Sequence, residues 1–173
     1  NGIENVHAFH CGLGEEAENQ TEAKMDFSSK LNAGGYSLGA IPGKDENIKI
    51  EKLDDILNAT DRIALIKADV EGYELKLLMG AANLIERDRP FLYLENDKVE
   101  SSPELISYLW GLKYDIWWHV VPLFNPRNRA NTEQNIFSTI ASLNIICAPR
   151  EKGFNITDSS KIDDANFHPL KRG

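Results

Sequence analysis

Three acidic residues stand where two apolar segments of the chain end. The largely apolar residues 63–68 run into Asp69, with Glu71 two positions later, and the apolar residues 91–94 run into Glu95. In an open α/β sheet, ligands bind beyond the carboxyl ends of the strands, so these carboxylates are expected at one edge. A carboxylate there can act as a general base if burial or a neighbouring acid raises its pKa. Asp69 and Glu71 are the two candidates for that base.

Other residues near these acids have simpler structural roles. Glu74 is expected to complement the positive end of a helix that begins after Asp69. An acid at the tip of an apolar strand has little structural purpose, so Asp69 and Glu71 keep a functional assignment. His10 and His119 are alternative bases, but a packed or solvent-exposed histidine is the simpler interpretation of each.

A metal site at this edge is a further alternative. The oxygen ligands that Mg²⁺ and Ca²⁺ prefer are available from Asp69, Glu71, Glu95 and Asn96. Their spacing matches no dedicated metal-binding loop, and no Cys/His pair has the spacing of a zinc site. No metal ligand is therefore assigned.

Strands and helices alternate around these acids. The period of apolar residues from 73 to 86 predicts one amphipathic helix, and Ser101 and Ser102 mark the start of another. Strand–helix–strand succession predicts right-handed crossovers and a parallel sheet, whereas the last two strands, with no clear helix between them, are expected to pair antiparallel at an edge. Strands are expected at residues 6–11, 48–50, 63–69, 91–95, 114–121 and 143–148.

The segment 63–96 resembles the signature block of the FkbM-type methyltransferase family. The matching residues are Lys67-Ala68-Asp69-Val70-Glu71-Gly72-Tyr73-Glu74, then Leu78-Met79-Gly80-Ala81, Arg89-Pro90 and Leu94-Glu95-Asn96. Asn5-Val6 and Gly12-Leu13-Gly14 resemble the strand and turn that precede this block. The resemblance extends over residues 1–120.

This resemblance implies a class I, Rossmann-like enzyme that transfers a methyl group from S-adenosylmethionine. The acceptor implied is a hydroxyl oxygen on a sugar, polyketide or similar metabolite. Cofactor-binding roles are implied for Gly12, Leu13, Asp69 and Val70, with the first two near the adenine and Asp69 beside the methionine or the reacting methyl. Catalytic roles are implied for Asp69, Glu71 and Glu95, the latter two on the acceptor side.

The sequence also departs from the family pattern. Gly12-Leu13-Gly14 does not open a helix, and no glycine-rich turn follows a first strand. The chain is therefore interpreted as the C-terminal part of a methyltransferase, lacking the first βαβ unit. Residues 1–149 are expected to form the partial domain, with a hairpin-like excursion at 24–50, and 150–173 a polar, loosely packed tail. A non-catalytic binding module and another doubly wound α/β transferase remain alternatives.

Composition sets the remaining expectations. The net charge of −8 disfavours nucleic-acid binding, and no apolar run is long enough for a membrane span. Cys11 and Cys147 are expected to be reduced thiols, as in the cytoplasm. A small-molecule acceptor is the expected partner, together with a homo-oligomer that covers the open sheet edge. Trp117 and Trp118 could line an acceptor site or simply pack, and two loop arginines could clamp an anionic acceptor or be solvated: Arg127 and Arg129.

Overall fold

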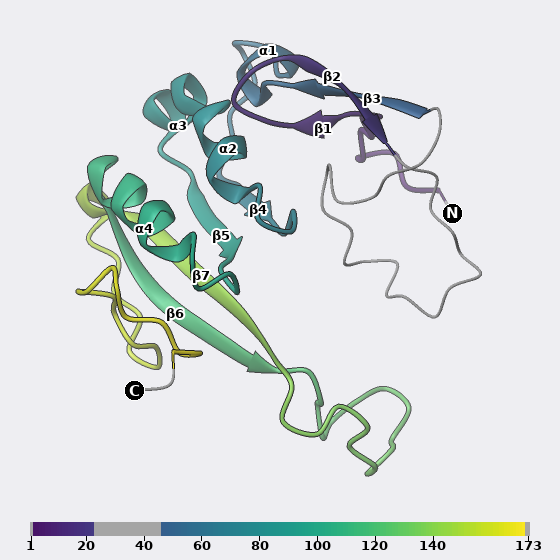
Figure 1. Cartoon of the computed structure of the whole chain (residues 1–173), viewed down its shortest axis with the longest axis vertical. Helices are drawn as coiled ribbons and strands as arrows, with labels where there is room; N and C mark the ends of the chain where they lie inside the picture. Colours follow the sequence, from purple (N-terminus) through teal and green to yellow (C-terminus); the bar gives the residue numbers. More distant parts are fainter. Residues whose placement is uncertain (1, 23–45, 172–173) are drawn as a thin grey trace.

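The computed structural model of the chain describes residues 2–22 and 46–171, which form two β-sheets with helices packed against them (Figure 1). The smaller sheet has the order β1-β3-β2 and the larger has the order β4-β5-β7-β6. The strands of the smaller sheet are β1 (Gly12–Leu13), β2 (Glu18–Glu22) and β3 (Glu46–Glu51). Those of the larger sheet are β4 (Leu65–Ala68), β5 (Phe91–Glu95), β6 (Tyr114–Pro122) and β7 (Ala141–Pro149).

Strand directions in the larger sheet place several strand ends at one edge. β4 and β5 pair in parallel, and β7 pairs antiparallel with both β5 and β6. β4, β5 and β6 therefore point the same way, and their carboxyl ends share an edge. The mixed α/β class is confirmed, as is the antiparallel pairing of the last two strands, which puts β6 at the edge of the sheet.

One predicted strand is wrong. Residues 6–11 have no strand assignment, and the strand β1 covers only Gly12 and Leu13, which were expected to end it. Val6 and Phe9 are exposed, and within the described ranges no strand pairs with residues 6–11. An alternating sequence forms a strand only where a neighbour satisfies its backbone groups.

The segment after β1 contains a strand that the sequence did not indicate. Residues 15–23 are polar and acidic, a composition typical of a loop, but β2 lies within them and pairs antiparallel with β3. β3 is longer than the expected strand at 48–50. Most of the predicted hairpin-like excursion at 24–50 lies outside the described residues, which resume at residue 46.

The helix expected between β4 and β5 is broken into two. The helices are α1 (Leu53–Ile56), α2 (Glu74–Met79), α3 (Ala82–Asp88) and α4 (Ser102–Gly111), followed by the 3-10 turn η1 (Arg150–Lys152). Gly80, between α2 and α3, lies so close to the carbonyl oxygen of Gly14 that a Cβ built there would be 1.9 Å from it. The backbone turns at this contact, and Asp54 then caps α3 by accepting the backbone N–H groups of Asn83 (3.0 Å) and Leu84 (2.9 Å).

Replacing Asp54 by alanine is therefore expected to destabilise the fold. The substitution leaves two helix N–H groups without their acceptor, which typically costs about 1 kcal/mol, and up to about 2 kcal/mol. Urea unfolding of Asp54→Ala beside Asp55→Ala, an exposed neighbour on the same helix, measures the difference. Equal losses of stability in the two variants would contradict the capping role.

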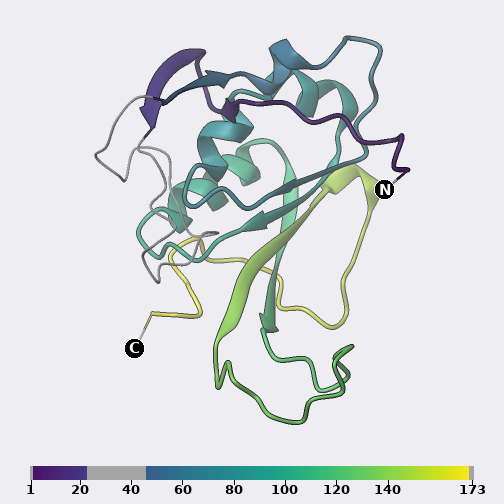
Figure 2. The same ribbon diagram turned by 90° about the vertical axis from the view of Figure 1, so that its right-hand side faces the viewer.

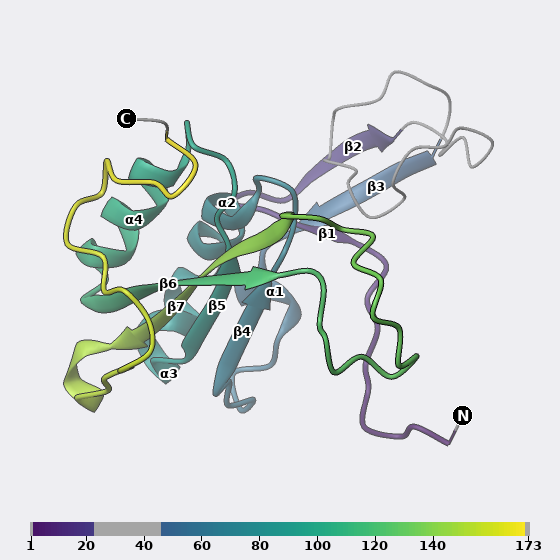
Figure 3. The same ribbon diagram turned by 90° about the horizontal axis from the view of Figure 1, so that it is seen from below.

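Helices α2, α3 and α4 cover one face of the larger sheet. In the core, alternate residues of neighbouring strands pack against these helices. Figure 3 shows α4 running beside β6. Fully buried members include Leu78, Ile85, Leu92, Leu94, Ile106, Leu109, Ile116 and Ile145. Among helices of the described segments, none has both the length and the apolar character of a membrane span.

The C-terminal segment is packed more closely than expected. It runs along the outer edge of β6 (Figure 1), where the backbone N–H of Trp118 donates to the Ser160 carbonyl and the backbone N–H of Ile162 donates to the Ile116 carbonyl. Ile162 and His168 are buried. The segment thus covers an edge that would otherwise expose unpaired backbone groups.

Candidate active site

The acids predicted to converge do meet at the carboxyl edge of β4 and β5. Asp69 and Val70 directly follow β4, and Glu95 is the last residue of β5. Between the strand and α2 the backbone takes a left-handed turn, with φ +52° at Glu71 and +93° at Gly72. A non-glycine residue in this conformation is uncommon and often marks a functional site.

Glu74 has the structural role expected of it. Its buried carboxylate accepts the backbone N–H groups of Val70 (3.0 Å) and Gly72 (3.4 Å). These bonds hold the turn that carries Glu71 against the start of α2. Glu74 is therefore a support of the site.

Two of the predicted catalytic acids are already paired with lysines. Lys67 Nζ lies 3.2 Å from Asp69 Oδ2, and Lys98 Nζ lies 3.2 Å from Glu71 Oε2. Lys98 also contacts Asp97 at 3.0 Å, and the hydrogen bonds that its ammonium group donates to Asp97 and Glu71 raise the pKa of that group. Sequence reasoning missed Lys98, which sits 27 positions from Glu71.

Glu95 differs from the other two acids. Its Oε2 atom is buried and has no hydrogen-bond partner. Burial, reinforced by the negative charges of Asp97, Asp69, Glu71 and Glu74, raises the pKa of Glu95 to about 7. The base was expected at Asp69 or Glu71, but Glu95 has the raised pKa that a general base requires near neutral pH.

A buried histidine supports the residue next to Glu95. His168 Nε2 lies 3.1 Å from the backbone oxygen of Asn96, and His168 Nδ1 accepts the N–H of Leu170 at 3.1 Å. Because Nδ1 accepts, Nε2 carries the proton and donates it to Asn96. The Asn96 side chain donates to Ser102 Oγ at 2.9 Å, so Ser102 is held here and makes no capping bond in α4. No local signal identified His168, which is 72 positions from Asn96.

The remaining tryptophan and histidine candidates match the simpler interpretations given to them. His119 Nδ1 is 3.0 Å from the Tyr93 hydroxyl, and His10 is exposed. Trp117 and Trp118 are 1% and 5% exposed, which fits the packing interpretation.

Gly12 and Leu13 lie away from the acidic edge. The backbone N–H of Val70 donates to Glu74, the first residue of α2. At the other end, Gly14 packs against Gly80, which follows the last residue of α2. One helix of six residues, roughly 9 Å long, therefore separates the two sets of predicted cofactor residues. Leu13 lines an apolar cavity of about 230 Å³ together with Phe9, Cys11, Leu53, Ile56 and Leu57.

Asp69 and Glu71 were also candidate ligands of a metal ion. Lysine ammonium groups already engage Asp69 and Glu71. Within residues 2–22 and 46–171, no group of three or more His, Cys, Asp or Glu side chains is arranged to hold a metal ion.

The fold gives the structural class of this chain, and comparison with known proteins gives its family. The fold is a mixed α/β domain with acids at the strand ends. The family model described as methyltransferase FkbM domain matches residues 3–116 of the chain. The chain belongs to this family. Among solved structures, it is similar to the methyltransferase FkbM from Methylobacillus flagellatus KT, with 19% identity, a TM-score of 0.47 and coverage of 79% of this chain. The chain spans 27% of the length of that protein. No curated protein matches it.

Proposed function

We propose that this chain carries an S-adenosylmethionine-dependent methyltransferase domain of Rossmann-like type that methylates a hydroxyl oxygen, with Glu95 as the general base. The observation that carries the proposal is the enclosed, unpartnered Oε2 of Glu95, whose pKa is raised to about 7 at an edge rich in carboxylates. A carboxylic acid with that pKa is half ionised at neutral pH. It can accept a proton in one step and return it to water in the next.

The chemistry divides between the cofactor and the protein. When bound, S-adenosylmethionine supplies a methyl group already activated on a sulfonium. Glu95 Oε2 would take the hydroxyl proton of the acceptor as the acceptor oxygen bonds to the methyl group. The methyl–sulfur bond would break with its electron pair going to sulfur, which leaves neutral S-adenosylhomocysteine and a protonated Glu95. Alignment of the acceptor oxygen by surrounding residues can contribute about 7–11 kcal/mol to lowering the barrier.

The predicted cofactor residues fit this chemistry in two places. The apolar cavity beside Leu13 suits a flat aromatic base, and Gly12 lies next to it in β1. Asp69 and Val70, at the other end of α2, would lie beside the cationic amino-acid portion, where the excess of carboxylates favours a positive charge. Glu71, paired with Lys98, would line the acceptor side.

The acceptor class proposed is a sugar, polyketide or related hydroxylated metabolite. Family membership favours a methyltransferase over another doubly wound α/β transferase. A non-catalytic methyltransferase-like module is the remaining alternative. The acidic chain, with a net charge of −8, supports a small-molecule acceptor in preference to a nucleic acid.

Cofactor binding and its pH dependence test the proposal. Calorimetric titration of the chain with S-adenosylhomocysteine should give saturable heat. Transfer of a tritiated methyl group to a panel of simple sugars and hydroxy acids should rise with pH and reach half its maximum near pH 7, because Glu95 must be ionised to accept a proton. Absence of any heat with S-adenosylhomocysteine would contradict the proposal and favour the non-catalytic module.

A further inference from the structure

The loop that joins β6 to β7 begins at the same edge as Glu95. β6 runs parallel to β5, and Glu95 is level with Asn144 of β7, which in turn is level with His119 of β6. β6 continues past this level to Pro122, and the loop of residues 123–140 then extends beyond the sheet (Figures 1 and 2). The loop therefore lies beyond the level of Glu95, on the β6 side of the sheet, and only an elongated acceptor could reach both.

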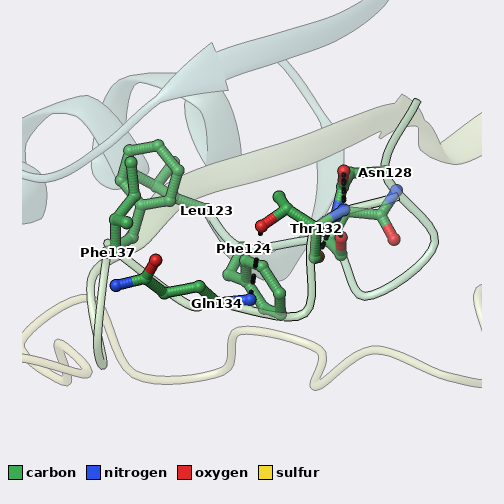
Figure 4. A pocket seen from close by; sticks show the side chains of 8 residues that line it. Leu123, Phe124, Asn128, Thr132, Gln134 and Phe137 are labelled. Carbon is green, nitrogen blue, oxygen red and sulfur yellow. Dashed lines mark hydrogen bonds between the residues drawn. The ribbon is translucent and has the colours of Figure 1, made fainter. Parts of the chain in front are cut away.

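The loop forms a mostly apolar cavity, open to solvent, of about 360 Å³, the low end of the range for small-molecule sites. In Figure 4, Leu123 and Phe137 lie together on one side of the cavity, and Asn128 and Thr132 lie towards the other. The lining side chains all come from this one loop: Leu123, Phe124, Asn125, Asn128, Thr132, Gln134, Ile136 and Phe137.

Hydrogen bonds within the loop hold the cavity open without a ligand. The Asn128 side chain donates to the carbonyl oxygens of Asn125 (3.0 Å) and Thr132 (2.7 Å) and accepts the Thr132 N–H (3.2 Å). Asn125 Oδ1 accepts the N–H of Arg127 at 2.9 Å. A site that is already shaped loses less conformational entropy when a ligand binds.

Several groups in the loop are left for a ligand to satisfy. Ile136 is 74% exposed, Leu123 47% and Phe137 39%, although all three face the cavity region. Arg127 and Arg129 flank the lining residue Asn128 and are exposed, and neither has an ion pair with any residue of the described part of the chain. A cluster of apolar side chains in a loop that also carries two exposed arginines is suited to a ligand that is apolar along its body and anionic at one point.

We propose that this cavity binds the apolar body of an elongated, hydroxylated acceptor whose anionic group is held by Arg127 and Arg129. This inference rests on the proposed function, because it assigns the acceptor of the same site. Asn144, level with Glu95, is three positions along β7 from its first residue, Ala141, a span of roughly 10 Å at the usual rise per residue. The reacting hydroxyl must therefore lie about that far, or farther, from the portion seated in the loop.

Binding of a defined amphiphile tests the cavity without any methyl transfer. The probe is ω-hydroxylaurate, which has a hydroxyl, an apolar chain and a carboxylate, and the comparison probe is the uncharged α,ω-diol of the same chain length. Calorimetry should show saturable binding of ω-hydroxylaurate that is roughly tenfold weaker with Ile136→Ser or Phe137→Ser. The matched control is Phe167→Ser, since Phe167 is 56% exposed outside the loop. Ile136 is exposed enough for its replacement to leave folding intact.

Substitution of the two arginines tests the anion-binding part of the proposal separately from the apolar cavity. A double variant, Arg127→Gln with Arg129→Gln, should weaken ω-hydroxylaurate roughly fivefold and leave the diol unchanged. No binding of ω-hydroxylaurate by the unaltered chain, or equal loss with Phe167→Ser, would overturn the inference. If the chain then still methylates other acceptors, the proposed function stands and only this inference fails. If the loop variants weaken ω-hydroxylaurate binding but the chain does not bind S-adenosylhomocysteine, the proposed function fails and the cavity assignment stands.

Discussion

Replacing Glu95 by glutamine is expected to lower methyl transfer by about 10²-fold or more, because the amide cannot take the proton of the acceptor hydroxyl. The side chain keeps its shape, so S-adenosylhomocysteine binding should be retained. The remaining activity should also lose its rise with pH near 7, where the carboxyl of Glu95 titrates. Glu86→Gln, an exposed acid on α3, is the control and should behave as the unaltered chain does.

The same substitution should stabilise the fold in alkaline conditions. The pKa of Glu95 is raised from 4.5 to about 7 in the folded state, so the folded chain binds this proton more tightly than the unfolded chain does. Stability from this group is therefore greatest at low pH and falls as the pH rises from about 4.5 to about 7. After allowance for partial exposure, the loss is on the order of 1–2 kcal/mol.

Chemical unfolding of Glu95→Gln between pH 5 and 8 measures this effect. The free energy of unfolding of the variant, relative to that of the unaltered chain, should increase progressively across this pH range. If both proteins lose stability in parallel, Glu95 is not the enclosed, proton-binding carboxyl that the proposed mechanism needs. Unchanged methyl transfer by the variant would also remove Glu95 as the base.

Gly80→Ala is expected to have the largest effect on stability. A Cβ at this position would lie 1.9 Å from the Gly14 carbonyl oxygen and 2.9 Å from its carbon, and both are backbone atoms that no side-chain rotation can move. Gly80 must therefore separate from Gly14, which would disturb the junction of α2, α3 and β1. Overpacking of this kind costs about 3 kcal/mol, and for a chain of 173 residues this lowers Tm by roughly 10 °C.

Gly111→Ala is the matched control for this prediction. A Cβ on Gly111, the last residue of α4, meets no atom within 4 Å. Alanine is the better helix former, so this variant should be unchanged or gain up to about 1 kcal/mol. Urea midpoints compared at equal m-values give both differences. A Gly80→Ala variant as stable as Gly111→Ala would contradict the close packing of Gly80 on Gly14.

Local sequence patterns were sufficient for the central elements of the fold. The segment 91–95 was predicted as a strand and forms β5, and residues 63–69 contain β4. Their apolar character predicted burial on both faces. Burial instead alternates along β4, which lies at the edge of its sheet, and Leu65 is 59% exposed. The acids at the tips of these strands were found in the same way. Residues 6–11 show where this reasoning fails, since a strand also needs a partner that its own sequence does not specify.

The sequence by itself determined the family, the acid-tipped strands and the edge at which Asp69, Glu71 and Glu95 meet. Only the tertiary structure decided which of the three carboxyl groups has a raised pKa. Lys98 engages Glu71 across 27 positions, while burial and four neighbouring acids act on Glu95. It also decided the break between α2 and α3, set by Gly14 against Gly80. The physical reason is that ionisation and close packing depend on groups brought together from distant parts of the chain, whereas periodicity reports only on neighbours along it.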